Sequence, residues 1–149
     1  MIPEIVTHAR GAFMISTDRA FLDINVIHTY LSRDSYWAQG RTLDTVQRSL
    51  DHSLCFGVYE GAAQVGFARV VTDYATFGWI ADVFILPSHR GQGLSKWLVE
   101  SIVAHPRLQN LRRLVLATRD AHELYAKYGG FVPLVEPARW MEKRRAPTP

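Results

Sequence analysis

The strongest constraint on the fold of this chain is the segment from Trp79 to Ile102, which reads as a strand, a glycine loop and a helix in that order. Trp79 to Leu86 is a nearly continuous run of apolar, β-branched and aromatic residues, which is typical of a strand buried on both faces. Pro87 ends this run. The period then changes to that of an amphipathic helix packed back on the sheet, with inward positions at Leu94, Trp97, Leu98, Ser101 and Ile102.

The loop between these two elements is Arg90-Gly91-Gln92-Gly93-Leu94-Ser95. Glycines directly before a helix let the backbone turn tightly and point free N–H groups at one place, which suits a phosphate or pyrophosphate. A dinucleotide-binding fingerprint would need a third glycine where Lys96 stands, and the Gly-Lys-Ser/Thr of a P-loop is absent. Taken alone, the loop leaves two interpretations open: a phosphate cradle, or an ordinary glycine turn before a helix.

The residues before this segment predict two helices and a meander of strands. The expected elements are a strand at 13–16, a helix at about 19–31, a loop at 32–40 that carries Tyr36 and Trp37, a helix capped by Thr42 with Leu43, Val46 and Leu50 inward, and strands at 54–59, 64–72 and 78–86. The turn Glu60-Gly61-Ala62 joins the first two of these three strands, so an antiparallel meander is expected.

The residues after the central helix predict a second buried strand at 113–118, which a right-handed crossover would place parallel to the first. Asp120 is expected to cap a further helix, which Gly129-Gly130 ends. Two closing strands are expected at 131–135 and 139–142. The fold class is therefore α/β (α+β mixed): one domain over residues 1–149, with a mostly antiparallel mixed sheet, a parallel βαβ unit, helices on both faces, and a flexible tail from about residue 144.

Composition excludes several classes of protein. With 17 basic and 14 acidic side chains the net charge is only +3, and no basic stripe interleaved with aromatics is present, so we do not expect a nucleic-acid binder. No window approaches the roughly 20 apolar residues of a membrane helix, and the first residues lack a secretory core, so we expect a cytoplasmic protein with no membrane partner. No Cys, His, Asp and Glu cluster has metal-ligand spacing, so no metal is expected.

Two motifs of the chain resemble signatures of the GNAT superfamily of acetyl-CoA-dependent N-acetyltransferases. Arg90 to Ser95 is similar to the Arg/Gln-x-x-Gly-x-Gly/Ala motif, with Ser95 in place of the final Gly or Ala. Leu124-Tyr125-Ala126-Lys127-Tyr128-Gly129-Gly130-Phe131 is similar to Leu/Phe-Tyr-x-Lys-x-Gly-Phe, with one additional glycine. The two motifs stand in the family's order and separation, and the resemblance covers nearly the whole chain.

The resemblance implies a role for each matching residue. The loop N–H groups of Arg90, Gly91, Gln92, Gly93, Leu94 and Ser95 would hold the pyrophosphate of coenzyme A. The backbone of Val83, Phe84 and Ile85 would hydrogen-bond the pantetheine arm as an added strand does. Tyr125 would protonate the departing thiolate, although a buried helix-face aromatic is the alternative for this residue. Many relatives carry an Asn seven residues before the tyrosine, where this chain has Thr118.

The general base is the least specified residue. Asp82, in the strand beside the thioester site, would accept the amine proton directly or through water; the alternative is a structural carboxylate bonded to nearby backbone or to Arg90. Asp73, His28 and His122 are weaker candidates. Aromatic side chains at Tyr30, Tyr36, Trp37 and Trp140 suggest an aromatic-lined acceptor site.

The sequence therefore predicts an N-acetyltransferase that moves the acetyl group of acetyl-CoA, its cosubstrate, directly to a primary amine of a small molecule or protein. No acyl-enzyme is expected, because Cys55 precedes the cofactor unit in an apolar run. A non-catalytic acyl-CoA-binding or sensing module is the alternative function. A homodimer is left open.

Overall fold

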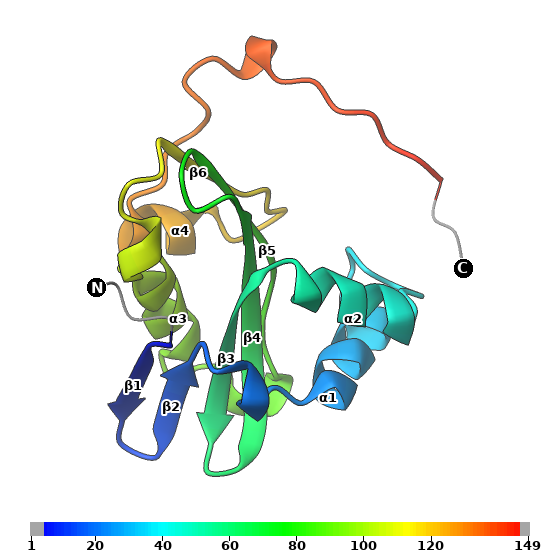
Figure 1. Cartoon of the computed structure of the whole chain (residues 1–149), viewed down its shortest axis with the longest axis vertical. Coiled ribbons are helices and arrows are strands. Elements are labelled where there is room, and N and C mark those ends of the chain that lie inside the picture. Colours follow the sequence, from blue (N-terminus) through cyan, green and yellow to red (C-terminus); the bar gives the residue numbers. More distant parts are fainter. Residues whose placement is uncertain (1–4, 147–149) are drawn as a thin grey trace.

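The computed structural model describes residues 5–146 and is built on one six-stranded sheet, in which the strands follow chain order (Figure 1). All neighbouring strands are antiparallel except β5 and β6, which are parallel. This confirms the mixed, mostly antiparallel sheet with a parallel βαβ unit. The strands are β1 (Thr7–Arg10), β2 (Phe13–Ser16), β3 (Leu54–Glu60), β4 (Ala63–Thr72), β5 (Phe77–Ile85) and β6 (Arg113–Val115).

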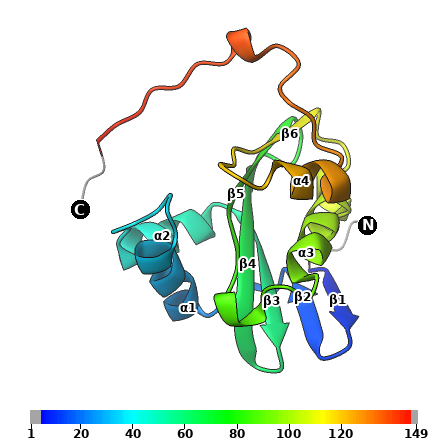
Figure 2. The same cartoon turned by 180° about the vertical axis from the view of Figure 1, so that it is seen from behind.

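Helices cover both faces of this sheet, as Figures 1 and 2 show from opposite sides. On one face lie α1 (Ile24–Thr29) and α2 (Leu43–Asp51), and on the other lie α3 (Leu94–Val103) and α4 (His122–Gly129). The predicted inward residues of α3 are all buried. Each face therefore has its own apolar core, in which a fully buried Leu or Phe side chain contributes about 1.5–3 kcal/mol.

The sequence predicts one continuous helix at about residues 19–31, and this prediction is wrong. The chain forms a 3₁₀ turn at Arg19–Phe21, then α1, then a π-helical turn at Tyr30–Asp34. The Asp23 carboxylate accepts the N–H groups of Asn25 and Val26 and so starts a new helix, which a continuous helix would not allow. In α2, Val46 and Leu50 are buried as expected, but Leu43 is 46% exposed.

The sequence pattern does not predict β1, because Thr7–Arg10 is exposed and shows no apolar alternation. This strand forms by pairing with β2, with Thr7 opposite Ser16 and Arg10 opposite Phe13. The Arg10 guanidinium also lies 4.8 Å from the Trp97 ring centroid on α3, within the range of a cation–π contact. Non-local contacts therefore form this element where local propensity does not.

The predicted closing strands at 131–135 and 139–142 are wrong. Residues 132–146, which we name the C-terminal arm, are exposed and form one 3₁₀ turn at Pro137–Arg139. Figures 1 and 2 show the arm leaving the sheet in orange and red. Pro133 and Pro137 each lack a backbone donor, which disfavours strand pairing. The chain thus leaves the sheet before residue 144, where the sequence predicts the start of the tail. Tail residues 147–149 lie outside the described residues. The strand predicted at 113–118 is β6, which ends at Val115.

A bulge interrupts the pairing of β5 with β4. Phe67 lies opposite Phe84 and Arg69 opposite Ala81, so β5 has one more residue in this interval than β4. Asp82 lies in the bulge with φ +55°, a left-handed conformation that Asp tolerates better than most residues. Because β6 pairs with β5 only over Phe77–Trp79, residues 80–85 of β5 have no strand on that side within the described chain.

Candidate active site

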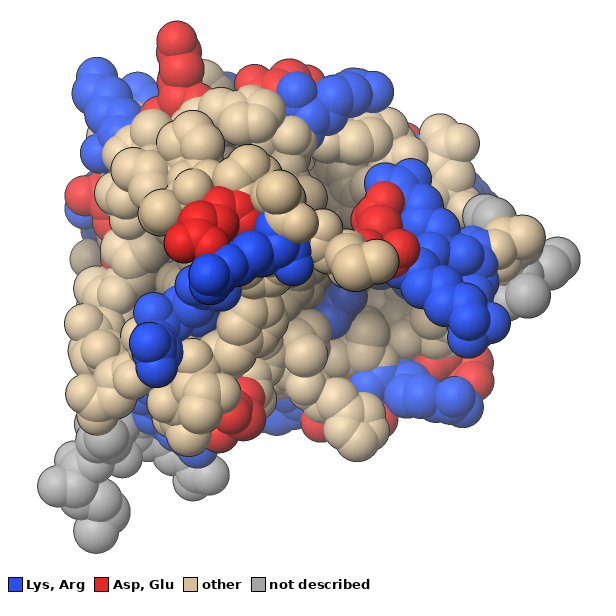
Figure 3. Space-filling model, turned by 90° about the horizontal axis from the view of Figure 1, so that it is seen from above, with Lys and Arg blue, Asp and Glu red and all other residues tan. Residues whose placement is uncertain are grey.

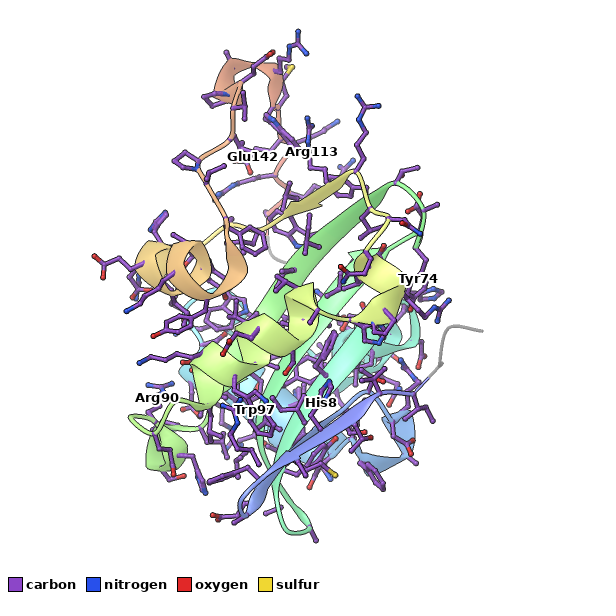
Figure 4. All side chains as sticks on the ribbon, turned by 90° about the vertical axis from the view of Figure 1, so that its left-hand side faces the viewer. His8, Tyr74, Arg90, Trp97, Arg113 and Glu142 are labelled. Atoms are coloured by element: carbon purple, nitrogen blue, oxygen red, sulfur yellow. The ribbon has the colours of Figure 1, made fainter. Side chains whose placement is uncertain are left out.

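The glycine loop presents free N–H groups at the start of α3. Gly91 and Gly93 both have φ +83°, a left-handed value that favours glycine, and Gly93 is the N-cap of α3. The backbone N–H groups from Gln92 to Lys96 make no hydrogen bond to described residues. Figure 4 shows Arg90 in the loop at this end of α3. Free donors at the positive end of a helix dipole attract an anion.

A cavity of about 530 Å³ runs from this loop along the open edge of β5. Most of the predicted cofactor residues line it: Val83, Phe84, Ile85, Arg90, Gly91, Gly93, Leu94 and Ser95. Gln92 does not, and its side-chain amide donates to the carbonyl of His89. Arg90 donates to the Ile85 carbonyl (2.9 Å) and the Tyr30 hydroxyl (2.8 Å), which holds the loop against the end of β5.

Tyr125 lies on α4 at the far end of this cavity. Its side chain is 8% exposed, and its ring packs edge-on against Phe131 at 6.0 Å. The hydroxyl makes no hydrogen bond to any described residue and is not sealed from solvent. Burial, with a smaller contribution from Tyr36, raises the pKa of Tyr125 to about 12. The phenol is therefore protonated at neutral pH and is available as a donor.

Asp82 is the centre of a buried polar network. Its Oδ2 accepts from Arg69 Nε (2.6 Å) and Arg41 Nη1 (2.9 Å), and its Oδ1 accepts from Trp37 Nε1 (2.8 Å). Burial alone would raise the pKa of the Asp82 carboxyl, but Arg69, Arg41 and the Trp37 hydrogen bond together hold that pKa below its usual value. The partners of Asp82 are thus neither backbone nor Arg90, and its ionised form is a weak proton acceptor.

A second cavity, about 480 Å³ in volume, is also lined by Tyr125. Arg41, Arg69, Trp79 and Asp82 line it, and it shares Val83 and Tyr125 with the first cavity. Seen from above, the molecular surface has a hollow with both basic and acidic residues around it (Figure 3). The two cavities therefore meet at Tyr125.

The aromatic loop forms a wall common to both cavities. Tyr36 and Trp37 line both of them. The backbone N–H of Arg119 donates to the Tyr36 hydroxyl (3.1 Å), and the Arg119 guanidinium lies 3.8 Å from the Tyr36 ring centroid. Tyr30 lines the first cavity only, stacked on Phe84 at 4.1 Å. Trp140 lines neither and instead lies by Phe77 and Arg113.

The weaker base candidates lie outside both cavities. Asp73 closes a turn, where hydrogen bonds from the Thr76 hydroxyl and neighbouring N–H groups hold its pKa well below the usual range. His28 Nε2 lies 3.1 Å from the Arg41 carbonyl, and His122 is exposed at the start of α4. Burial raises the pKa of the Cys55 thiol to about 11, so Cys55 is a core residue and no nucleophile.

The start of α4 corrects one predicted cap. The Thr118 hydroxyl, and not the Asp120 carboxylate, accepts the N–H of Ala121 (3.1 Å). The position that carries Asn in many relatives thus has a local structural role here.

Sequence reasoning missed the basic residues of the second cavity. Arg69 interrupts the apolar run of β4, in Gly66-Phe67-Ala68-Arg69-Val70, and a charged residue within a buried strand needs a partner. That pattern, together with Asp82 in the next strand, was a usable signal for an ion pair. Arg41 follows Gly40 in a loop and carried no comparable signal.

Comparison with known proteins decides the family. The Acetyltransferase (GNAT) family model matches residues 24–131. The chain belongs to this family. A protein of Gibberella zeae assigned as an acetyltransferase is 35% identical to it over 140 residues, which cover 79% of this chain and 78% of that protein.

Solved structures of acetyltransferases share the fold of this chain. A crystal structure assigned to the GNAT family, from Xanthomonas campestris pv. campestris, is 50% identical, with a TM-score of 0.85 and coverage of 97% of this chain and 96% of that one. A Clostridium acetobutylicum acetyltransferase crystallised with acetyl-CoA is 15% identical, with a TM-score of 0.61 and 95% coverage of both chains; it supports the fold alone. Within residues 5–146, no helix is long and apolar enough to cross a membrane.

Proposed function

We propose that this acetyltransferase transfers the acetyl group of acetyl-CoA directly to a primary amine. The observation that carries the proposal is that two cavities share Tyr125 in their lining, one with the glycine loop and the other with Arg41 and Arg69. Acetyl transfer needs a donor and an acceptor that reach one point from two directions. The first cavity offers anion-binding N–H groups at one end and an unpaired strand edge along its length, which suits a pyrophosphate followed by an extended amide-bearing arm.

In the proposed reaction a neutral amine in the second cavity attacks the thioester carbonyl in the first. A C–N bond forms, the C–S bond breaks, and the thiolate accepts the Tyr125 proton while water takes a proton from the amine. Burial raises the pKa of Tyr125 to about 12, and the same environment raises the pKa of the leaving thiol. The raised pKa keeps the phenol protonated until the thiolate forms but makes it a weaker acid than free tyrosine, so proton transfer depends on the thiolate being desolvated, and hence more basic, in the same site.

Asp82 has a positioning role in this proposal. Two guanidinium groups and an indole N–H already occupy both of its oxygens, so taking the amine proton would cost these interactions. We assign Asp82 to orienting Arg41 and Arg69 in the acceptor cavity, with water as the proton acceptor.

The test is the Tyr125→Phe variant, with thiol release from acetyl-CoA measured over a panel of primary amines. Loss of a general acid typically costs about 10²–10⁴-fold in turnover, so we expect kcat to fall by at least about 10²-fold. The KM for acetyl-CoA should change little, because the ring remains. Tyr128→Phe, one turn along α4 and outside both cavities, is the matched control. Unchanged kcat in Tyr125→Phe would remove the acid role, and acetyl-CoA that fails to bind would remove the donor.

A further inference from the structure

The geometry points to an acceptor amine that also carries an anionic group, a carboxylate or a phosphate, bound by Arg41 and Arg69. This inference rests on the proposed function, since it takes the second cavity to be the acceptor site. It names a class of acceptor, which the family match does not specify.

The first argument is charge. Arg41 and Arg69 share the single carboxylate of Asp82, at 2.9 Å and 2.6 Å. The other charged residues of this cavity have partners of their own: Arg119 lies 3.9 Å from Asp120, and Arg144 lies 2.8 Å from Glu142. One positive charge at the Arg41–Arg69 pair is therefore left without a countercharge among the described residues. A partly buried charge of this kind favours an anionic ligand.

The second argument is the donors that remain. The Asp82 contact uses Nη1 of Arg41, and Nε and Nη2 of Arg41 make no hydrogen bond to described residues. Arg69 uses Nε for Asp82 and Nη1 for the Ser53 hydroxyl (3.2 Å), which leaves Nη2. None of these remaining nitrogens is among the buried unpartnered atoms, so they are accessible to solvent, and both arginines line this cavity. Guanidinium N–H groups in a fork match the two oxygens of a carboxylate or the oxygens of a phosphate.

The third argument is that the pair is held in place before any ligand arrives. The Arg41 and Arg69 side chains are only 23% and 14% exposed, and that of Asp82 is 2% exposed. Trp37 Nε1 fixes the second oxygen of Asp82, so the carboxylate has little freedom to turn away. Fixed donors lose little entropy when a ligand binds, which strengthens binding.

The test compares amines that differ only in the anionic group. Calorimetry on the protein saturated with coenzyme A would measure binding of phosphoethanolamine against ethanolamine, and of β-alanine against propylamine, and needs no turnover. We expect phosphoethanolamine, β-alanine or both to bind at least 10-fold more tightly than the paired amine that lacks the anionic group. The phosphate and carboxylate pairs show which anion the site prefers.

Variants keep the test specific to the arginine pair. Arg41→Gln should remove the preference, Arg41→Lys should keep part of it, and Arg48→Gln, at an exposed position on α2, should leave it intact. Equal binding of both members of each pair, no binding of any of the four compounds, or a preference that survives Arg41→Gln would overturn the inference. Failure of coenzyme A itself to bind would instead overturn the proposed function. The two failures can be distinguished, because the amine titrations can be repeated on the protein without coenzyme A.

Discussion

The substitution Asp82→Asn should destabilise the protein through one identifiable set of contacts. It removes the negative charge shared by Arg41 and Arg69 but keeps an oxygen that can accept from Trp37. Removing one partner of a buried ion pair costs about 3–5 kcal/mol. The arginine side chains are 23% and 14% exposed, so water recovers part of their solvation. We therefore expect the free energy of unfolding to fall by about 2–4 kcal/mol.

Urea denaturation at pH 7 measures this loss, and Glu142→Gln is the matched control. The Glu142–Arg144 pair has a similar N–O distance, 2.8 Å, but its side chains are 71% and 85% exposed, so its loss should cost less than about 0.5 kcal/mol. Similar small losses in both variants would refute the assigned role of burial.

The pH dependence gives a second check on Asp82. Its folded-state pKa is depressed, so its stabilisation is present above the unfolded-state pKa, about 3.9, and is lost as the pH falls through the folded-state pKa. The stability difference between the wild type and Asp82→Asn should therefore be constant from about pH 5 to 7 and shrink in stronger acid. A difference that grew on acidification would contradict the sign of the shift.

Three further predictions test the loop, the core and the arm. Gly93→Val should raise the Kd for coenzyme A at least about 10-fold. The control is Gly11→Val, at another left-handed glycine (φ +59°) in the β1–β2 turn, which should leave that Kd unchanged. Equal Kd values in the two variants would show that the loop is not part of the cofactor site. Cys55, with its pKa raised to about 11, should react with iodoacetamide at least about 100-fold more slowly in the native protein than in urea, and comparable rates would show that the thiol is accessible. In the C-terminal arm, the side chains of Val135 and Met141 are 87% and 98% exposed, so Val135→Asn and Met141→Gln should each change the free energy of unfolding by less than about 0.5 kcal/mol. Ile102→Ala in the core should cost about 2–5 kcal/mol. A loss above about 1 kcal/mol at either arm position would show that the arm packs on the protein.

The parts of the fold that the sequence predicts well are those in which local pattern and burial agree. The segment from β5 through the glycine loop to α3 forms the predicted strand, loop and helix, and the inward residues of α3 are buried as expected. The prediction that the strand is buried on both faces is wrong, because Trp79 is 38% exposed and Ala81 and Val83 are only partly buried. Gly130 ends α4 with φ +72°, as a glycine pair after a helical pattern indicates. These features depend on neighbours in the sequence and need no knowledge of the rest of the chain.

The errors arise where distant residues decide the local structure. β1 depends on its register with β2, and α1 begins late because Asp23 accepts N–H groups that a continuous helix would use differently. In the site, the loop and Tyr125 carry recognisable motifs, and Arg69 with Asp82 on the next strand carries a weaker signal, whereas Arg41 joins them from a distant loop. No spacing rule relates Arg41 to the other two residues, so only the fold shows that contact.

The bulge in β5 explains why the two sides of the site occur together. Side chains alternate along a strand, so one additional residue changes which face the following side chains occupy. At the bulge, Asp82 takes a left-handed conformation and contacts Arg69 and Arg41, while the next residues, Val83 to Ile85, line the first cavity. β6 pairs with β5 only as far as Trp79, before the bulge, so the bulged part of β5 has no strand on that side among the described residues. The bulge therefore places the buried carboxylate that holds the arginines on the acceptor side next to the open strand edge proposed for the donor.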